Sequence, residues 1–277
     1  GPVRALAVSP DGKRLVSASF DTTAITWSLT SGVAEKVMRF HEGAASAVVF
    51  LPDGRVATSG EDARIAIWRT GDDKPVTILQ GHTAPVVSLA VSPDGKMLAS
   101  ASWDNTARLW PLGGGTPRVL EGHQQNVNGI AFTPNGRSVV TVGYDLTLRI
   151  WPLADGGSPT IITLPTPLNS VVVAPDGGII TAGATGKVYF LSAAGEIKGE
   201  VEAAAVPIIA LALSGDGKLV AASSVRGAVA IIEHDSRMLA RTLVGPGLPA
   251  RSVAFLPDDG TLLTGGTDRL IRRWNAT

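Results

Sequence analysis

Short apolar runs alternate with polar turns along the whole 277-residue chain. Residues 86–91 form one such run, a turn follows at 93–95, and further runs follow at 97–102 and 106–110. Short runs of this kind, bounded by Gly, Pro, Asp or Asn, are typical of β-strands. No apolar period of 3.6 residues persists for the length of a helix, which is at least about 10 residues. The pattern therefore predicts an all-β protein.

One turn recurs seven times. Pro-Asp-Gly or a variant of it begins at residues 10, 52, 93, 134, 175, 215 and 257, at intervals of 40 to 42 residues. A single four-stranded unit of this length cannot bury both of its faces, whereas seven units arranged radially pack each sheet on the next. We therefore predict one domain over residues 1–277, a seven-bladed β-propeller with four-stranded antiparallel blades. The expected blades cover residues 1–40, 44–80, 84–121, 125–164, 167–203, 206–245 and 248–277.

The last repeat is shorter than the others. The chain ends three residues after Trp274, whereas the first repeat continues after Trp27 into an outer strand at 35–40. We expect blade 7 to have three strands and an exposed edge. We also expect the chain to be part of a longer protein.

Polar positions are fixed within the repeats. In five repeats an aspartate lies six residues before a tryptophan, and a hydroxyl residue lies four residues before that aspartate. A histidine lies eleven residues before three of the turns. Three repeats contain all four residues: His41/Thr58/Asp62/Trp68, His82/Ser100/Asp104/Trp110 and His123/Thr141/Asp145/Trp151.

This spacing resembles the WD-repeat (WD40) family over essentially the whole chain. The resemblance implies a buried network in which the indole N–H donates to the hydroxyl, the hydroxyl to the histidine and the histidine to the aspartate. The first and last repeats lack the histidine, and the fifth and sixth have lost most of the network. We expect those two blades to rely on apolar packing, through Val188, Phe190, Val229 and Ile231.

Composition and charge exclude several classes of protein. There are 24 basic and 24 acidic residues, so the chain has no net charge that would attract nucleic acid or an anionic membrane. Without cysteine it can form neither a disulfide nor a thiolate metal site. Residues 203–213 form the longest apolar stretch, which is short and contains Pro207. We expect no nucleic-acid partner and no membrane insertion.

The recurrence of Ser, His and Asp argues against a catalytic triad, because an enzyme needs one such set and a scaffold needs one in each blade. We predict no catalytic residue, no metal and no cofactor. His234 lies outside the pattern, and we expect it in a solvated turn, with a metal or ligand contact as the alternative. A rival hypothesis is an enzyme or a small-molecule or metal binder that uses the central channel. The residues expected to face that channel are Leu6, Val48, Leu89, Ile130, Val172, Leu211 and Val253.

The rim of a propeller is where a partner would bind. The residue before each network aspartate projects there, and three of these are large aromatics in a chain with only 5% aromatic residues. The starts of the first strands supply further candidates. We predict a protein or peptide partner bound by Arg4, Phe20, Glu61, Trp103, Asn128, Tyr144 and Arg251. Arg4 and Arg251 would form a basic corner for a carboxylate; the alternative is that both are solvated rim charges.

A second, narrower resemblance concerns residues 1–26 and 146–191, the Trp-Pro-Leu sequences at 110–112 and 151–153, and the ending at 270–274. These segments are similar to bacterial WD-repeat domains joined to c-type cytochromes. That resemblance implies a docking module of a larger redox protein in the bacterial periplasm, with the cytoplasm as the alternative compartment. The identity of the partner and the oligomeric state are left open.

Overall fold

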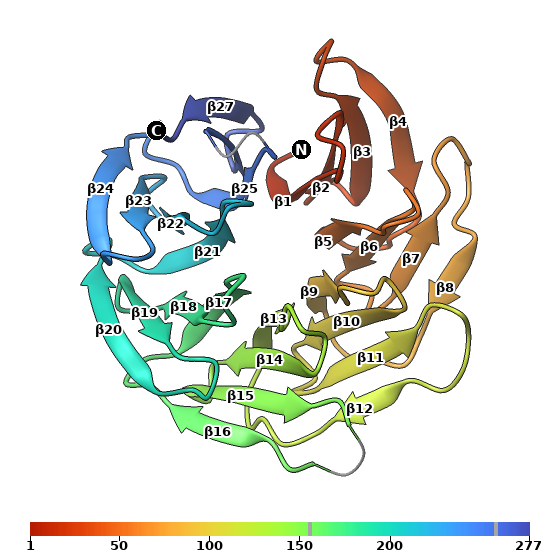
Figure 1. Ribbon diagram of the computed structural model, residues 1–277. Coiled ribbons are helices and arrows are strands. Elements are labelled where there is room, and N and C mark those ends of the chain that lie inside the picture. The colour runs from red at the N-terminus through yellow and green to blue at the C-terminus, as the bar shows by residue number, and fades with distance from the viewer. Residues whose placement is uncertain (155–156, 258–259) are drawn as a thin grey trace.

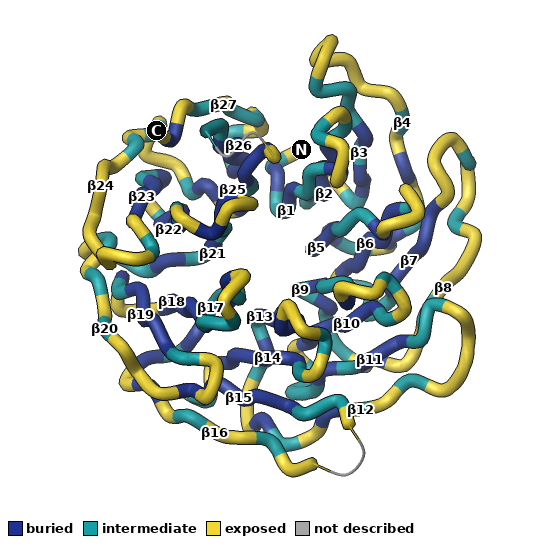
Figure 2. The backbone as a smooth tube through the Cα atoms, in the orientation of Figure 1, coloured by how far each residue is buried: buried dark blue, intermediate teal, exposed yellow. Residues whose placement is uncertain are grey.

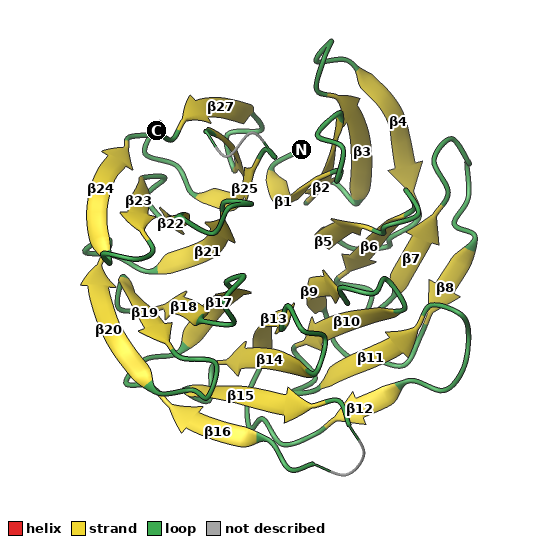
Figure 3. Cartoon of the chain, viewed as in Figure 1, coloured by secondary structure: helices red, strands yellow, loops and turns green. Residues whose placement is uncertain are grey.

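The computed structural model describes residues 1–154, 157–257 and 260–277. This part of the chain contains 27 strands and no helix, as Figure 3 shows. Asp258 and Asp259, which the sequence assigns to the seventh turn, lie outside the described residues. Within the described ranges there is therefore also no helix with the length and apolarity needed to cross a bilayer.

The strands form seven sheets arranged around a central axis (Figure 1). The first three blades are β1 (Val3–Val8), β2 (Arg14–Ser19), β3 (Thr23–Ser28) and β4 (Ala34–Arg39); β5 (Ala45–Phe50), β6 (Val56–Gly60), β7 (Ile65–Trp68) and β8 (Thr77–Leu79); and β9 (Val86–Val91), β10 (Met97–Ser102), β11 (Ala107–Pro111) and β12 (Arg118–Leu120). Blades 4 and 5 are β13 (Val127–Phe132), β14 (Ser138–Gly143), β15 (Thr147–Pro152) and β16 (Thr160–Thr163); and β17 (Leu168–Val173), β18 (Ile179–Gly183), β19 (Lys187–Leu191) and β20 (Ile197–Glu202). Blades 6 and 7 are β21 (Ile208–Leu213), β22 (Leu219–Ser224), β23 (Val229–Glu233) and β24 (Met238–Leu243); and β25 (Ala250–Phe255), β26 (Thr261–Gly266) and β27 (Ile271–Asn275).

Six sheets have four antiparallel strands in sequence order, and the seventh has three. The predicted all-β, seven-bladed propeller with a three-stranded last blade is confirmed. Neighbouring first strands contact one another around the ring, and β1 contacts β25. The N–H of Leu6 donates to Ser252 Oγ at 2.8 Å across the junction of blades 7 and 1. The ring therefore closes through its innermost strands.

The recurring turn joins the first and second strands of a blade. In blade 3 the Asp94 carboxylate accepts a hydrogen bond from the Ser92 hydroxyl at 2.6 Å and from the N–H of Lys96 at 3.1 Å. The intervening Gly95 has φ +69°, which glycine adopts without steric cost. The acidic side chain of the turn is thus used to hold the hairpin.

Apolar side chains fill the spaces between adjacent sheets. Ile208 and Leu211 of β21 pack in one cluster with Val188 and Phe190 of the preceding blade. Figure 2 shows that burial is greatest in the inner and middle strands and that the outer strands, β24 above all, are exposed. Sites that a partner can reach therefore lie on the loops at the two ends of the propeller and on its outer wall.

Candidate partner-binding face

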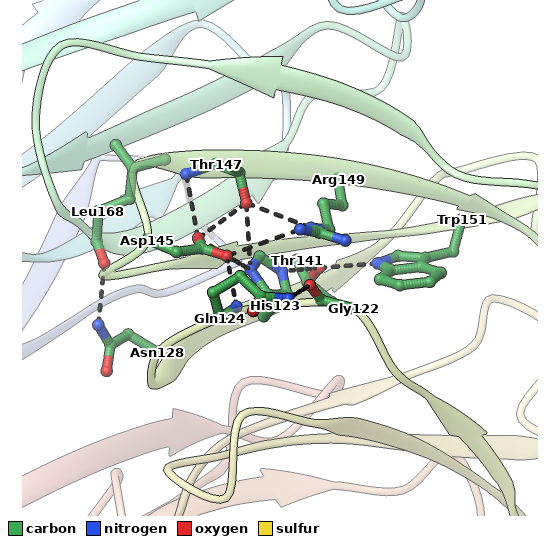
Figure 4. A network of polar contacts seen from close by, with 10 residues as sticks. All are labelled: Gly122, His123, Gln124, Asn128, Thr141, Asp145, Thr147, Arg149, Trp151 and Leu168. Atoms are coloured by element: carbon green, nitrogen blue, oxygen red, sulfur yellow. Dashed lines mark hydrogen bonds and ion pairs between the residues drawn. The ribbon is translucent and has the colours of Figure 1, made fainter.

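The network of blade 4 is a continuous chain of hydrogen bonds (Figure 4). Its aspartate belongs to the turn between β14 and β15, and we call the end of the propeller that carries these turns between second and third strands the loop-bearing end, or loop-bearing face. Trp151 Nε1 donates to Thr141 Oγ1 at 2.8 Å, and His123 Nε2 lies 2.8 Å from the same hydroxyl. His123 Nδ1 lies 2.9 Å from Asp145 Oδ2. An indole N–H can only donate, so the threonine accepts it and donates to Nε2, which leaves the Nδ1 proton for the aspartate.

Blades 2 and 3 contain the same chain of contacts. His41 Nε2 lies 2.9 Å from Thr58 Oγ1 and its Nδ1 lies 3.0 Å from Asp62. The corresponding distances from His82 are 2.8 Å to Ser100 and 2.7 Å to Asp104. The two tryptophans donate to the same hydroxyls, Trp68 to Thr58 at 3.0 Å and Trp110 to Ser100 at 2.8 Å. Each donor and acceptor of the chain is thus satisfied by another member, as a buried polar group requires.

The network also fixes the ionisation of its members. Burial opposes ionisation of Asp145, but hydrogen bonds from the N–H of Gln124, from Thr147 and from His123 outweigh it and hold the pKa of the carboxyl below its usual value. Burial lowers the pKa of His123, against the opposing attraction of Asp145. At neutral pH the aspartate is therefore charged and the imidazole neutral, which is the state that the hydrogen-bond directions require.

Two further kinds of residue belong to the network and were not predicted from the sequence. Thr106 and Thr147 each follow a network aspartate by two positions and donate to it, at 2.7 and 2.8 Å. Arg149 Nη2 lies 3.7 Å from Asp145, and the guanidinium lies over the Trp151 ring at 5.9 Å. Arg108 lies over Trp110 in the same way. The recurrence of Thr and Arg two and four residues after the aspartate was the signal that could have identified them.

The other blades retain fewer of these contacts. Trp27 donates to Ser17 and Trp274 to Thr264, each at 2.9 Å. In blade 7 the aspartate at the network position, Asp268, forms an ion pair with Arg272. In blades 5 and 6 the residues at the tryptophan position are Leu191 and Ile232, both buried. The four residues expected to replace the network by apolar packing, Val188, Phe190, Val229 and Ile231, are all buried.

Two of the candidate aromatic side chains lie exposed on the loop-bearing face. Trp103 is 40% exposed and Tyr144 is 42% exposed. Trp103 Nε1 donates to Asn128 Oδ1 at 3.0 Å, and Asn128 Nδ2 donates to the carbonyl of Leu168 at 3.0 Å. The amide of Asn128 is therefore already used to hold Trp103 against the start of blade 5.

The remaining candidates form a second cluster at blades 1, 2 and 7. Phe20 makes cation–π contacts with two guanidinium groups, with Arg4 Cζ 5.1 Å and Arg251 Cζ 5.2 Å from its ring centroid. Arg4 Nη1 donates to Glu61 Oε1 at 2.8 Å. We call Arg4, Phe20, Glu61 and Arg251 the basic corner, and Trp103 with Tyr144 the aromatic pair.

The central channel is lined chiefly by apolar residues. Leu6, Leu89 and Leu211 line it, as do Val48, Ile130, Val172 and Val253. In the described residues no three His, Asp or Glu side chains gather where they could hold a metal ion. His234 stacks on Phe190, with ring centroids 6.0 Å apart and an interplanar angle of 26°. Among its described residues the channel therefore presents neither a cluster of His, Asp or Glu side chains nor a metal centre.

Several yeast proteins are similar to part of the chain. It is 37% identical over 128 residues to the ribosome biogenesis protein YTM1 of Candida glabrata, which covers 39% of the chain and 28% of that protein. The YTM1 protein of Eremothecium gossypii is 36% identical over 118 residues, which is 38% of the chain and 26% of that protein. The Saccharomyces cerevisiae protein is 32% identical over 131 residues, covering 39% and 28%. The matched regions thus span little more than a quarter of these relatives.

These relatives correct the expected source and compartment. The similarity of short segments to cytochrome-fused domains predicted a bacterial periplasmic protein, but the matched relatives are yeast ribosome biogenesis proteins. The expectation of a bacterial periplasmic protein is therefore wrong, and nothing in these matches supports docking to a redox protein. The segments that suggested it lie in strands and turns of the propeller itself.

The repeats themselves also match a described family. The WD domain, G-beta repeat, matches residues 1–28, 32–69, 73–111, 114–152 and 238–275, which together make up more than half of the chain. The unmatched residues between 152 and 238 contain blade 5 and most of blade 6, where the hydrogen-bonded network is lost. With this match, the seven-bladed ring and the repeated network, the chain belongs to the WD-repeat family.

Proposed function

We propose that this propeller is a non-catalytic scaffold that binds a protein or peptide partner on its loop-bearing face. The observation that carries the proposal is the exposure of Trp103 and Tyr144 at equivalent positions of adjacent blades, 40% and 42%. The chain has few aromatic residues, and exposed tryptophan and tyrosine are enriched at the energetic centres of interfaces. Family membership and the yeast relatives favour the same non-enzymatic role.

The structure refines which candidate residues would contact the partner. The aromatic pair and the two arginines of the basic corner have accessible surface, whereas Asn128 acts by positioning Trp103 and Glu61 by pairing with Arg4. The absence of net charge favours a protein over a nucleic acid as the partner. Because the matched relatives are named as ribosome biogenesis proteins, components of that process are the first partners to test.

The test is a capture experiment with the double variant Trp103→Ala/Tyr144→Ala. The immobilised wild-type chain and the variant are exposed to the same yeast extract, and the captured proteins are compared. We expect the variant to lose the partner while its thermal midpoint stays within about 2 °C, because both side chains are on the surface. A matched control is Ile161→Ala, which removes an exposed side chain, 53% exposed, on the outer strand β16. Capture that survives the double substitution would contradict the assignment of the aromatic pair as the centre of the binding site.

The rival use of the channel is tested with the same protein. Isothermal titration with divalent metals and a screen for hydrolase activity would reveal a ligand or a reaction. The apolar lining of the channel favours a negative result, and a substrate turned over by the wild-type chain would overturn the scaffold proposal.

A further inference from the structure

The charge at the mouth of the channel is one-sided. A cavity of about 770 Å³ lies between the first strands of the blades. Each first strand places one residue at the equivalent position near the loop-bearing end: Arg4, Ser46, Val87, Asn128, Asn169, Ile209 and Arg251. Two of these are guanidinium groups, and no Asp or Glu occurs among the described residues that line the cavity. The lining of the opening is thus basic in a chain with no net charge.

The two arginines differ in how their charge is balanced. Arg4 is paired with Glu61 at 2.8 Å, and only 15% of its side chain is exposed. Arg251 is exposed, and among the described residues it has no carboxylate within ion-pair distance. Its described charged neighbour is Arg4, which contacts the same Phe20 ring. Arg251 is therefore the guanidinium that is left free to bind an anion.

The environment of Arg251 is unfavourable for an isolated charge. The Phe20 ring stabilises both guanidinium groups by cation–π contact but does not neutralise them. Burial around the channel mouth, followed by the charge of Arg4, lowers the pKa of Arg251. A carboxylate placed beside Arg251 would relieve this repulsion and would form a charge-assisted hydrogen bond.

We propose that Arg251 binds the carboxylate of an Asp or Glu side chain of the partner, so that the peptide recognised by this face is acidic. The inference rests on the proposed function and names its partner's chemistry. The pairing of Arg4 with Glu61 shows the mode of contact, because a carboxylate from a loop reaches a guanidinium of the channel mouth. The aromatic pair lies at blades 3 and 4 and is linked to the same mouth through Asn128, so an apolar residue of the same peptide would contact Trp103.

The experiment is a selection from a random 12-residue peptide library displayed on phage, with the peptides fused at their C-termini so that no free terminal carboxylate is present. Selected peptides are synthesised with amidated C-termini and titrated against the wild-type chain by fluorescence anisotropy. We expect enrichment of Asp and Glu, and affinity that falls as salt is raised. Arg251→Gln should weaken binding about tenfold and Arg251→Lys by less, with unchanged thermal midpoints.

Glu61 provides a second, independent variant. Since it competes for Arg4, Glu61→Gln should expose another guanidinium and tighten binding of the acidic peptides by about threefold. If Glu61→Gln instead abolishes binding, Glu61 is itself a partner contact and the inference is wrong.

Failure of this inference is distinguishable from failure of the proposed function. Peptides without acidic residues that bind wild type and Arg251→Gln equally, but not Trp103→Ala, would overturn the inference and leave the binding face intact. Peptides unaffected by any of these substitutions, or a library that yields no binder, would count against both.

Discussion

Blades 4 and 5 make the same tight turn between their second and third strands by different means. In blade 4 the residue after Asp145 is Leu146, with φ +64°, and the aspartate accepts the N–H of Thr147 at 3.1 Å across it. In blade 5 the aspartate is replaced by Thr185, and the following residue is Gly186, with φ +74°. Blade 6 repeats this with Arg226 and Gly227. A side chain that closes the turn lets an ordinary residue take the left-handed conformation; without it, glycine is required.

The interiors of blades 4 and 5 also differ, because blade 5 has apolar residues at positions where blade 4 has members of the network. The position of His123 in blade 4 is occupied by Leu164 in blade 5, and that of Trp151 by Leu191, both buried. Thr181 keeps the hydroxyl of Thr141, but it donates instead to the carbonyl of Ser170 at 2.8 Å. The polar member that blade 5 retains has thus found another acceptor, because a buried polar group without a partner is costly.

The largest expected effect comes from the network carboxylate. Asp145→Ala removes the acceptor of His123 and of two backbone N–H groups, and should lower the free energy of unfolding by about 3 kcal/mol. Thr185→Ala, at the equivalent exposed position of blade 5, should change it by less than about 0.5 kcal/mol. Urea unfolding at pH 7 measures both. Equal losses would show that the aspartate does not stabilise the blade through its contacts.

Removal of the hydroxyl at the centre of the network should lower the free energy of unfolding by less than removal of the aspartate. Thr141→Val leaves Trp151 Nε1 and His123 Nε2 without a partner and should cost about 2 kcal/mol. Thr181→Val, equally buried, removes a single hydrogen bond, to the carbonyl of Ser170, and should cost about 1 kcal/mol. Urea midpoints measured with an unchanged slope would give the two values, and a larger cost in blade 5 would contradict the comparison.

Substitutions in these turns should change the stability in opposite directions in the two kinds of blade. Gly227→Ala places a Cβ on a left-handed residue against the carbonyl oxygen of Leu248 and should destabilise by about 1–2 kcal/mol. Leu146→Gly relieves the strain of a left-handed leucine and should stabilise by up to about 1 kcal/mol, offset in part by the greater freedom of glycine in the unfolded chain. Thermal unfolding of both variants measures the difference. If Leu146→Gly is instead less stable than the wild type, the turn closed by Asp145 places no strain on Leu146.

Acidification should act on the network-bearing blades. The folded pKa of His123 is lowered, so below about pH 6.5 the unfolded chain takes up a proton that the folded chain does not, and stability falls. The pKa values of Asp62, Asp104 and Asp145 are also lowered, so their contribution is complete above about pH 4 and is lost below it. Thermal midpoints between about pH 7.5 and 4 test the histidine effect, and midpoints measured below about pH 4 test the aspartates. His123→Gln should flatten the first decline, and a midpoint that rose on acidification would contradict the assignment.

The fold was predictable because its signals are local and repeated. Seven turns at one interval define the number of blades, and the shortened last repeat predicts the three-stranded sheet. The pairing of Trp103 with Asn128 and of Arg4 with Glu61 was not predictable, since it joins residues of different blades whose side-chain directions depend on the packing of the ring. The same dependence explains why Asn128 and Glu61, chosen as partner contacts, have intramolecular contacts in the structure.

Four of the five matched repeats contain strands of two blades. The family match at residues 114–152 contains the outer strand of blade 3, β12, together with the whole network of blade 4, and the match at 73–111 is offset in the same way. The match at 114–152 also contains both Gly122 and Arg149, and a Cβ on this glycine would overlap that guanidinium. Duplication of such a unit would copy these mutually dependent residues together and deliver an edge strand to the neighbouring sheet. The ring could thus gain or lose whole repeats during evolution without separating the residues of one network.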